Sequence, residues 1–296
     1  MSLLTKFSRY KISTHKAQTS LRRSFQCSER RRVRSWSRGY AAKLLPIAKL
    51  SDPEMRITHN SPMRMLLDYL SADFNGGIPR ATVTQLLSHV TNRALGEYLV
   101  ELMRDEYTLR QIVKNSYVHQ LGFEKYILLT DVTNNRFSLR LHYWQKDSVT
   151  PFEGEIHNHC HSFTSKVFLG SLIHTFYDID PAGDSLSLFE YSIHPHTHVS
   201  KQRYIRNTGS VAISRSEVSS GQVYSLSSDI LHSVKVGSDF AVSLLIQGQQ
   251  ETSAATVMKT YEKSSNKYEG VGIGKMAREQ VSSRLSNIAE RLGYTQ

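Results

Sequence analysis

Apolar residues recur at helical spacing in the first part of the chain. Ser61 and Pro62 are typical of an N-cap and a first helical position, and a short apolar stripe follows them up to the breaker at residues 76–79. One further amphipathic helix is predicted after this breaker, and Thr108 with Gln111 predicts a capping box for the next. The two stripes are Met65, Leu66, Tyr69 and Leu70, and then Leu86, Leu87, Val90, Ala94, Tyr98 and Leu102.

From about Phe123 the pattern changes to short runs rich in β-branched and aromatic residues. Turn-forming residues separate these runs, for example at 181–184 and 207–209. Many short strands with such punctuation are typical of β-sandwiches and barrels. A last amphipathic helix is predicted before Gly293, its C-cap. The expected strands are 126–129, 137–144, 167–177, 186–193, 211–213, 222–226 and 240–246.

These patterns divide the chain into five segments. We expect a basic leader at 1–40, a linker at 41–60, a helical segment at 61–118 that packs on a barrel at 119–250, and a tail with a helix at 251–296. The length of 296 residues supports a sizeable buried core. No apolar run approaches the ~18 residues of a membrane span, so no span is expected.

The positive charge of the protein belongs to its amino-terminal segment. The net charge is +11, but residues 1–50 contain thirteen Lys and Arg and one acid, a charge of +12, which leaves −1 for the rest of the chain. A nucleic-acid partner is therefore not expected for the body of the protein. The two cysteines, Cys27 and Cys160, are too few for a disulfide framework and favour a reducing compartment.

The amino-terminal segment resembles a mitochondrial transit peptide. It is rich in Arg and Ser and poor in acids, and Arg38 precedes Tyr40 and Ala41 as in the cleavage pattern of such peptides. This resemblance implies the mitochondrial matrix. The alternative is a basic tail, able to bind anionic polymers, on a cytoplasmic protein.

Two stretches carry histidines in a pattern that suits a metal site. His157 and His159 are two residues apart, so on a strand both imidazoles point to the same face. Gly170 follows an apolar run and predicts a tight turn between two strands. Downstream, His232 follows a turn that begins at Gly221. Three imidazoles can hold Fe, Zn, Cu or Ni, and nothing in the residues chooses among these metals.

These stretches resemble the two motifs of the cupin superfamily. In that family HxH is followed by a glutamate and then a glycine, and a second motif of glycine, Pro-x-Gly and histidine completes the site. His157, His159 and Gly170 match the first motif, and Gly221 and His232 match the second. The resemblance implies a mainly β fold, a cupin or jelly-roll β-barrel, with the N-terminal helices and the C-terminal helix added to it.

The departures from these motifs indicate a branch of the superfamily. Phe163 stands where the family glutamate belongs, while Ser227 and Asp229 replace the proline and glycine of the second motif. A metal held by His157, His159 and His232 without a carboxylate resembles the cysteine-dioxygenase-like cupins. The similarity covers about residues 119–250 and is most continuous in 136–144, 156–159 and 169–178.

This resemblance implies a non-haem iron dioxygenase that oxidises a small molecule with O2. Fe(II) is the expected metal, with Zn, Ni, Cu or Mn as other divalent candidates. Two alternatives stay open, namely a metal-binding cupin without turnover that acts as a sensor or interaction module, and an isomerase or epimerase of the sugar-cupin type. Because cupins commonly form dimers, a homodimer is also an expectation of the resemblance.

Three further residues are candidates for substrate contact. On an extended strand Arg140 and His142 share one face, and the resemblance turns that face toward the metal. Arg140 would then anchor a carboxylate or phosphate, unless it lies on the solvated face. Tyr224 and Tyr177 are candidate phenolic donors, or half-buried wall residues.

Other histidines compete for the role of ligand. His161 shares a strand face with His157 and His159 and could be a ligand or an outer hydrogen-bonding group. His194, His196 and His198 alternate in a polar stretch, which predicts an exposed loop and leaves a second metal site open.

The parts with which cysteine dioxygenases recognise cysteine are missing. Val234 occupies the position of their tyrosine two residues after the third histidine, and the run 126–130 lacks their arginine. The cysteine that some members cross-link to that tyrosine is absent near Phe163. Free cysteine is therefore not the expected substrate.

Overall fold

The structure of this protein is a computed structural model. It describes residues 61–72, 79–131, 136–146, 155–193, 200–260 and 274–294. The basic leader and the linker predicted for residues 1–60 lie outside the described residues, as do His194, His196 and His198.

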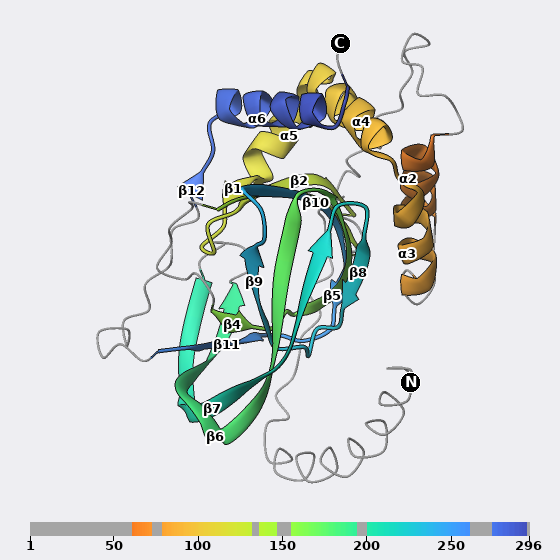
Figure 1. The fold of residues 1–296 in the computed structure, drawn as a ribbon. Helices are drawn as coiled ribbons and strands as arrows, with labels where there is room; N and C mark the ends of the chain where they lie inside the picture. The colour runs from red at the N-terminus through yellow and green to blue at the C-terminus, as the bar shows by residue number, and fades with distance from the viewer. Residues whose placement is uncertain are drawn as a thin grey trace, which may run out of the picture. The chain divides into compact units, whose positions relative to one another are not determined.

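Two antiparallel sheets form the body of the protein (Figure 1). The seven-stranded sheet has the strand order β12-β1-β2-β3-β10-β5-β8, and the five-stranded sheet has the order β11-β4-β9-β6-β7. An additional pairing joins β11 to β6. The strands are β1 (Tyr117–Val118), β2 (Glu124–Thr130), β3 (Ser138–Gln145), β4 (Ile156–His157), β5 (His161–Leu169), β6 (Ser171–Ile193), β7 (Ser200–Ser219), β8 (Val223–Leu226), β9 (His232–Val236), β10 (Phe240–Gln250), β11 (Ala255–Lys259) and β12 (Gly274–Lys275).

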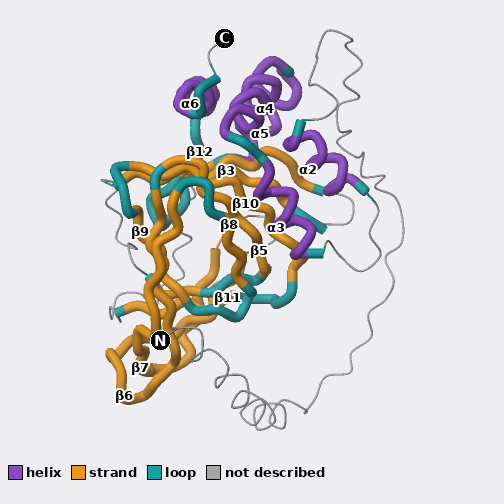
Figure 2. Tube along the Cα trace, turned by 45° about the vertical axis from the view of Figure 1, so that its right-hand side comes forward, coloured by secondary structure: helices purple, strands orange, loops and turns teal. Residues whose placement is uncertain are grey.

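Helices pack on the outer face of the seven-stranded sheet (Figures 1 and 2). They are α2 (Pro62–Ser71), α3 (Arg80–His89), α4 (Asn92–Arg104), α5 (Glu106–Asn115) and α6 (Arg278–Arg291). None of the described helices is long and apolar enough to cross a membrane. The fold is a mainly β, cupin-like jelly roll with N-terminal helices and a C-terminal helix, which confirms the expected fold class.

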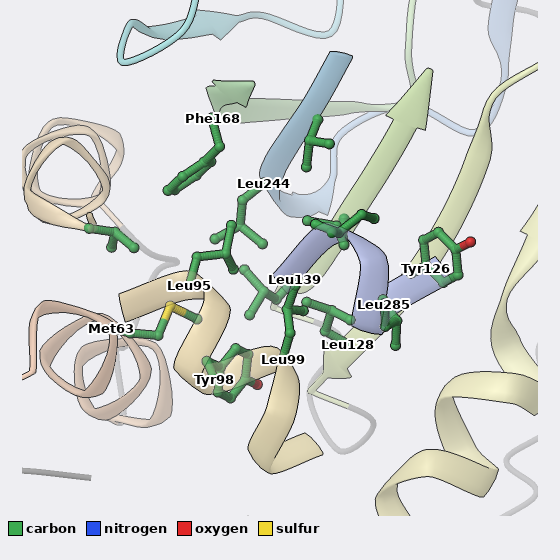
Figure 3. Close-up of a cluster of buried hydrophobic side chains, with 14 of the residues drawn as sticks. Met63, Leu95, Tyr98, Leu99, Tyr126, Leu128, Leu139, Phe168, Leu244 and Leu285 are labelled. Carbon is green, nitrogen blue, oxygen red and sulfur yellow. The ribbon is translucent and has the colours of Figure 1, made fainter. Parts of the chain in front are cut away.

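The hydrophobic core between the helices and this sheet depends on alternation along the strands. Leu139 and Leu141 of β3 are fully buried, in one hydrophobic cluster with helical residues such as Leu95 and Leu99. Figure 3 shows Leu139 together with Leu95 and Leu99. Side chains at the intervening positions of β3 point to the opposite face of the sheet. The helices therefore cover the apolar side of β3 and leave its other side to face the interior between the two sheets.

Two helix boundaries differ from the sequence-based expectation. The single helix predicted after residue 79 is two helices, because Thr91 caps α4 by accepting a hydrogen bond from the Ala94 amide. The buried amine of Lys166 also donates to the Ser88 and Val90 carbonyl oxygens at the end of α3, at 2.8 Å each. The capping box expected at Thr108 is wrong, since Asp105 is the N-cap of α5 and accepts from the Tyr107 amide.

The turns expected at 181–184 and 207–209 are also wrong. Both segments lie within the paired strands β6 and β7, where a register shift lets Ile179 and Asp184 both pair with Ser210. A Cβ at Gly183 would overlap the Ser210 carbonyl oxygen, and one at Gly209 would overlap the Asp180 carbonyl oxygen. These glycines therefore permit close backbone approach at a bulge, which in sequence looks like a turn.

The strands continue past residue 250, where the predicted barrel ends. β11 pairs with β4 and β6, and β12 pairs with β1. The limits of the five predicted segments otherwise stay predictions.

Candidate metal centre

Pairing between β4 and β9 brings the first two histidines together. His157 and His232 are directly opposite each other in this antiparallel pair, which places their Cβ atoms about 4.5–5.5 Å apart. His159 follows β4, and its amide donates to the Ser228 carbonyl oxygen at 3.2 Å. The ring centroids of the three histidines are 4.7–5.1 Å apart.

The three imidazoles form a cluster that could hold a metal ion. One nitrogen of each of His157, His159 and His232 lies within 4.8 Å of the others, and the described part of the chain contains no other such group of His, Cys, Asp or Glu. These are the three ligands that the sequence predicts. Gly170, expected at a turn, joins β5 to β6 with a φ of +70°.

Backbone carbonyls fix the orientation of two of the rings. The Nδ1 of His157 lies 3.0 Å from the Glu155 carbonyl oxygen, and the Nδ1 of His232 lies 3.1 Å from that of Ile230. Because a carbonyl oxygen only accepts, each Nδ1 carries the hydrogen and each Nε2 keeps its lone pair. This is the arrangement in which an imidazole acts as a metal ligand.

Burial keeps the cluster neutral. Burial lowers the pKa of His232 to about 3 and also lowers the pKa of His157. It lowers the pKa of His159 well below the usual range. Neutral imidazoles suit Fe, Zn, Cu or Ni. Phe163, at the position of the family glutamate, supplies no carboxylate. Its ring lies edge-on to that of His159, with ring centroids 5.1 Å apart. The donor set therefore fits a divalent transition metal with three protein ligands.

The cluster opens into a cavity of about 340 Å³ between the two sheets. Arg140, His142 and Tyr224, the predicted substrate contacts, all line this cavity. Tyr177 is not among the residues that line it, and its hydroxyl lies 3.2 Å from Ser233 Oγ. The predicted face of β3 is therefore the interior face, although the roles of these residues stay predictions.

Strand register explains which groups face the cluster. Across the seven-stranded sheet, Tyr117 of β1, Lys125 of β2 and His142 of β3 are consecutive cross-strand partners. Arg140 lies two residues before His142 and faces the same side. The cavity thus has the three-histidine cluster on one wall, and Lys125, Arg140, Tyr117 and His142 on the other.

Sequence reasoning missed Lys125 and Tyr117. The run 126–130 contains no arginine, and Lys125 lies one residue before it. Lys125 is only 8% exposed. A signal was present, because Lys125 alternates with the core residues Tyr126 and Leu128 and so belongs to the opposite face.

Further histidines line the cavity outside the cluster, among them His161 and His174. His161, the alternative ligand, places its Nδ1 3.1 Å from the Gly248 carbonyl oxygen and is not in the cluster. Among the described residues neither ring nitrogen of His174 has a hydrogen-bond partner, and burial lowers its pKa to about 4. Its ring centroid lies 5.8 Å from that of His232.

A hydrogen-bond network holds the segments that carry the ligands. The Glu251 carboxylate accepts from the Ser228 hydroxyl at 2.6 Å and from the Ser162 amide at 3.2 Å. The Ser162 hydroxyl accepts from the Ser228 amide, and the Ser228 carbonyl accepts from the His159 amide. Glu251 therefore connects the end of β10 to the start of β5 and to the loop before His232.

We expect Glu251→Gln to weaken the affinity for divalent metals by about tenfold, because groups that orient metal ligands typically contribute about 10–100-fold. Glu251 touches no ligand side chain, so the loss arises from poorer positioning of His159 and His232. Titration with Co(II), followed by its visible absorption, measures the affinity. Glu97→Gln is the matched control, because Glu97 pairs with Arg93 on the exposed side of α4. Equal affinities for the two variants would show that the network does not position the ligands.

Comparison with known proteins yields only distant structural similarity. No protein-family model matches the sequence, and a comparison with curated proteins gives no match. The fold is similar to that of the hydroxypropylphosphonic acid epoxidase of S. wedmorenis in complex with fosfomycin, with 8% identity, a TM-score of 0.27 and coverage of 42% of this chain and 50% of that one. This chain thus spans about half the length of that protein.

Two other solved structures are similar at the same level. A cupin superfamily protein of Desulfitobacterium hafniense has 10% identity, a TM-score of 0.24 and coverage of 43% of this chain and 78% of that one. The oxalate decarboxylase of Bacillus subtilis has 14% identity, a TM-score of 0.28 and coverage of 48% and 29%. At these values the similarities say nothing about activity, which depends on the geometry of this chain. The described residues form a cupin-like jelly roll with a three-histidine cluster that could hold a divalent metal ion.

Proposed function

We propose that this protein is a non-haem iron dioxygenase that oxidises a small molecule with O2. One observation carries this proposal: among the described residues three imidazoles, rather than four protein ligands, converge at the wall of a cavity of about 340 Å³. Structural metal sites are typically closed by four protein ligands, whereas catalytic sites keep open positions. The described residues leave room beside the cluster for a substrate.

Iron held by His157, His159 and His232 would supply electrons and open coordination positions for a substrate donor and O2. In a dioxygenation both oxygen atoms enter the product, so the substrate itself supplies the four electrons that reduce O2. No external reductant is then required. The proposal therefore asks the protein only for binding, orientation and exclusion of water.

The cavity wall offers polar groups for these tasks. Among the described residues His142 Nε2 and Trp144 Nε1 are buried without a hydrogen-bond partner, so a bound molecule can satisfy them. Burial raises the pKa of Tyr224 to about 12, which keeps its hydroxyl protonated as a donor. The rings of Phe123 and Trp144 stack with their centroids 4.0 Å apart and provide an apolar surface. Val234 lines the cavity in place of the tyrosine of cysteine dioxygenases, which argues against free cysteine as substrate.

Oxygen uptake tests this function. The full-length protein, loaded with Fe(II), is expected to consume O2 when supplied with small thiols, small acids or a small-molecule filtrate of a cell extract. His89→Ala is expected to behave as the wild type, since His89 is exposed at the end of α3. His157→Ala is expected to reduce uptake to the background rate, because it removes one of three ligands.

Firm iron binding without any O2 consumption would contradict the dioxygenase and favour the metal-binding module. Uptake by His157→Ala at the wild-type rate would separate O2 consumption from the cluster and would also contradict the proposal.

A further inference from the structure

Two cations, the buried Lys125 and the half-buried Arg140, face the three-histidine cluster without an acidic partner among the described residues. Lys125 and Arg140 both line the cavity, and among the described residues neither has a carboxylate within ion-pair distance. The Lys125 Nζ lies 5.2 Å from the Tyr117 ring centroid and 5.5 Å from that of Phe123. Arg140 Nε donates to the Ser138 hydroxyl at 3.1 Å. Their positive charges are thus solvated by aromatic rings and a hydroxyl rather than neutralised.

Removing the charges of Lys125 and Arg140 from water costs free energy. A charge taken out of water needs a partner, and like charges close together repel. Burial lowers the pKa of Lys125 and of Arg140, and the charge of Arg140 further lowers the pKa of Lys125. Burial alone would raise the pKa of Tyr117, but the charges of Lys125 and Arg140 and a hydrogen bond with Lys125 reverse this and lower it. Tyr117 therefore sits in a positive field.

Glu155, the one acid among the described residues that line the cavity, does not neutralise this pair. Glu155 Oε1 lies 3.7 Å from the Lys259 ammonium, so its charge already has a partner. The wall formed by β1, β2 and β3 therefore keeps a net positive charge.

The strand register gives this wall a shape that suits one end of a small molecule. Tyr117 and Lys125 are cross-strand partners, and Lys125 is also the partner of His142. Arg140 lies two residues before His142 on the same strand and faces the same side. On the opposite sheet His157 and His232 are themselves a cross-strand pair. The cavity between the two walls also includes the stacked rings of Phe123 and Trp144. A ligand can thus place an anionic group on one wall while its remaining part extends toward the histidines.

We propose that Lys125, Arg140 and Tyr117 form a subsite for the oxyanion group of a small acid, a carboxylate, sulfonate or phosphonate. The rest of the acid lies along Phe123 and Trp144 toward His157, His159 and His232. The subsite defines small acids as the substrate class of the proposed dioxygenase. The oxidation of such an acid rests on that proposed function, whereas its binding does not.

Calorimetric titration of the metal-free, full-length protein tests the subsite. The probes are benzoate, phenylphosphonate and benzamide, which share a phenyl ring and differ in charge. Both anions are expected to bind, and benzamide is expected to bind at least about tenfold more weakly, as a charge-assisted hydrogen bond is worth this much or more. Equal binding of benzoate and benzamide, or no binding of either anion, would overturn the proposal.

Lys125→Met and Arg140→Met separate a binding role from a structural one. Each variant is expected to lower the affinity for benzoate by about 10–100-fold. Its melting temperature is expected to stay equal or to rise, because an apolar side chain replaces an unpaired buried charge. Lys235→Met, at an exposed position of β9, is the matched control and should leave both quantities unchanged.

Unchanged benzoate affinity in Lys125→Met and Arg140→Met, or a lowered melting temperature in both, would show that the cations serve the fold instead. The metal-free His157→Ala/His232→Ala variant is expected to bind benzoate as the wild type does. Benzoate binding by a protein that neither holds iron nor consumes O2 would refute the dioxygenase and support the subsite, so the two failures are distinguishable.

Discussion

His232→Ala is expected to weaken the affinity for divalent transition metals by more than about 100-fold. Loss of a residue that only orients a metal ligand typically costs about 10–100-fold, and His232 is itself a ligand of the proposed site. His232 is 1% exposed, and its Nδ1 is held by the Ile230 carbonyl, so its Nε2 is fixed in place before any metal binds. Of the described residues, the variant leaves two imidazoles, from His157 and His159, and no carboxylate within the cluster. Water then has to replace a ligand that was positioned in advance.

Titration with Co(II), followed by its visible absorption, measures this loss. His161→Ala tests the neighbouring histidine, whose Nδ1 lies against the Gly248 carbonyl, and should retain most of the affinity. His89→Ala, at an exposed position at the end of α3, should match the wild type. If His161→Ala loses as much affinity as His232→Ala, the ligand set differs from the one described here.

Gly170→Ala is expected to destabilise the protein by about 2–5 kcal/mol. The φ of +70° at Gly170 costs a residue with a Cβ about 1–2 kcal/mol, and overpacking adds about 1–3 kcal/mol. The overlap here is with the carbonyl oxygen of Phe240, a backbone atom of the paired strand β10 that has no rotamer to change. Either β10 shifts or the turn between β5 and β6 opens.

Gly221→Ala is the matched control, because Gly221 has a similar φ of +88° with no atom near the added Cβ. It should cost only the conformational part, about 1–2 kcal/mol. Chemical denaturation of the two variants measures the free energies of unfolding. Equal losses would mean that the turn at Gly170 is less tightly packed than the structure shows.

Much of the fold follows from local patterns in the sequence. Alternation along 137–144 correctly separated the buried Leu139 and Leu141 from the face of Arg140 and His142. Ser61 before Pro62 marks the start of α2, and Gly293, with a φ of +82°, follows α6 as predicted. Each of these signals depends on neighbours close in sequence, which is why it is visible before the chain is folded.

The errors arose where distant residues decide the local structure. α3 and α4 have one continuous apolar stripe, and the break between them depends on Thr91 together with Lys166, which comes from β5. Gly183 and Gly209 look like turn residues because the sequence does not show which backbone approaches them. In both cases a contact made over a long sequence separation overrides the local preference.

The site divides in the same way. His157 and His159 were predictable from their spacing of two, and the resemblance to the cupin motifs added His232. The sequence indicates only that Lys125 lies on the face opposite Tyr126 and Leu128. Its place beside Tyr117 and the Glu251 network follow from strand register and from the meeting of β5, β10 and the loop before β9. A charged residue within a strand is usually solvated, and only the folded structure shows that Lys125 faces a cavity.

Metal content is the most direct test of the central claim that His157, His159 and His232 form a metal site. The full-length protein and its His157→Ala/His232→Ala variant would be loaded with Fe(II), freed of unbound metal, and compared by elemental mass spectrometry. We expect about one iron per chain in the wild type, as for a single three-ligand site, and essentially none in the variant. Iron retained by the variant, or absent from both proteins, would contradict the claim.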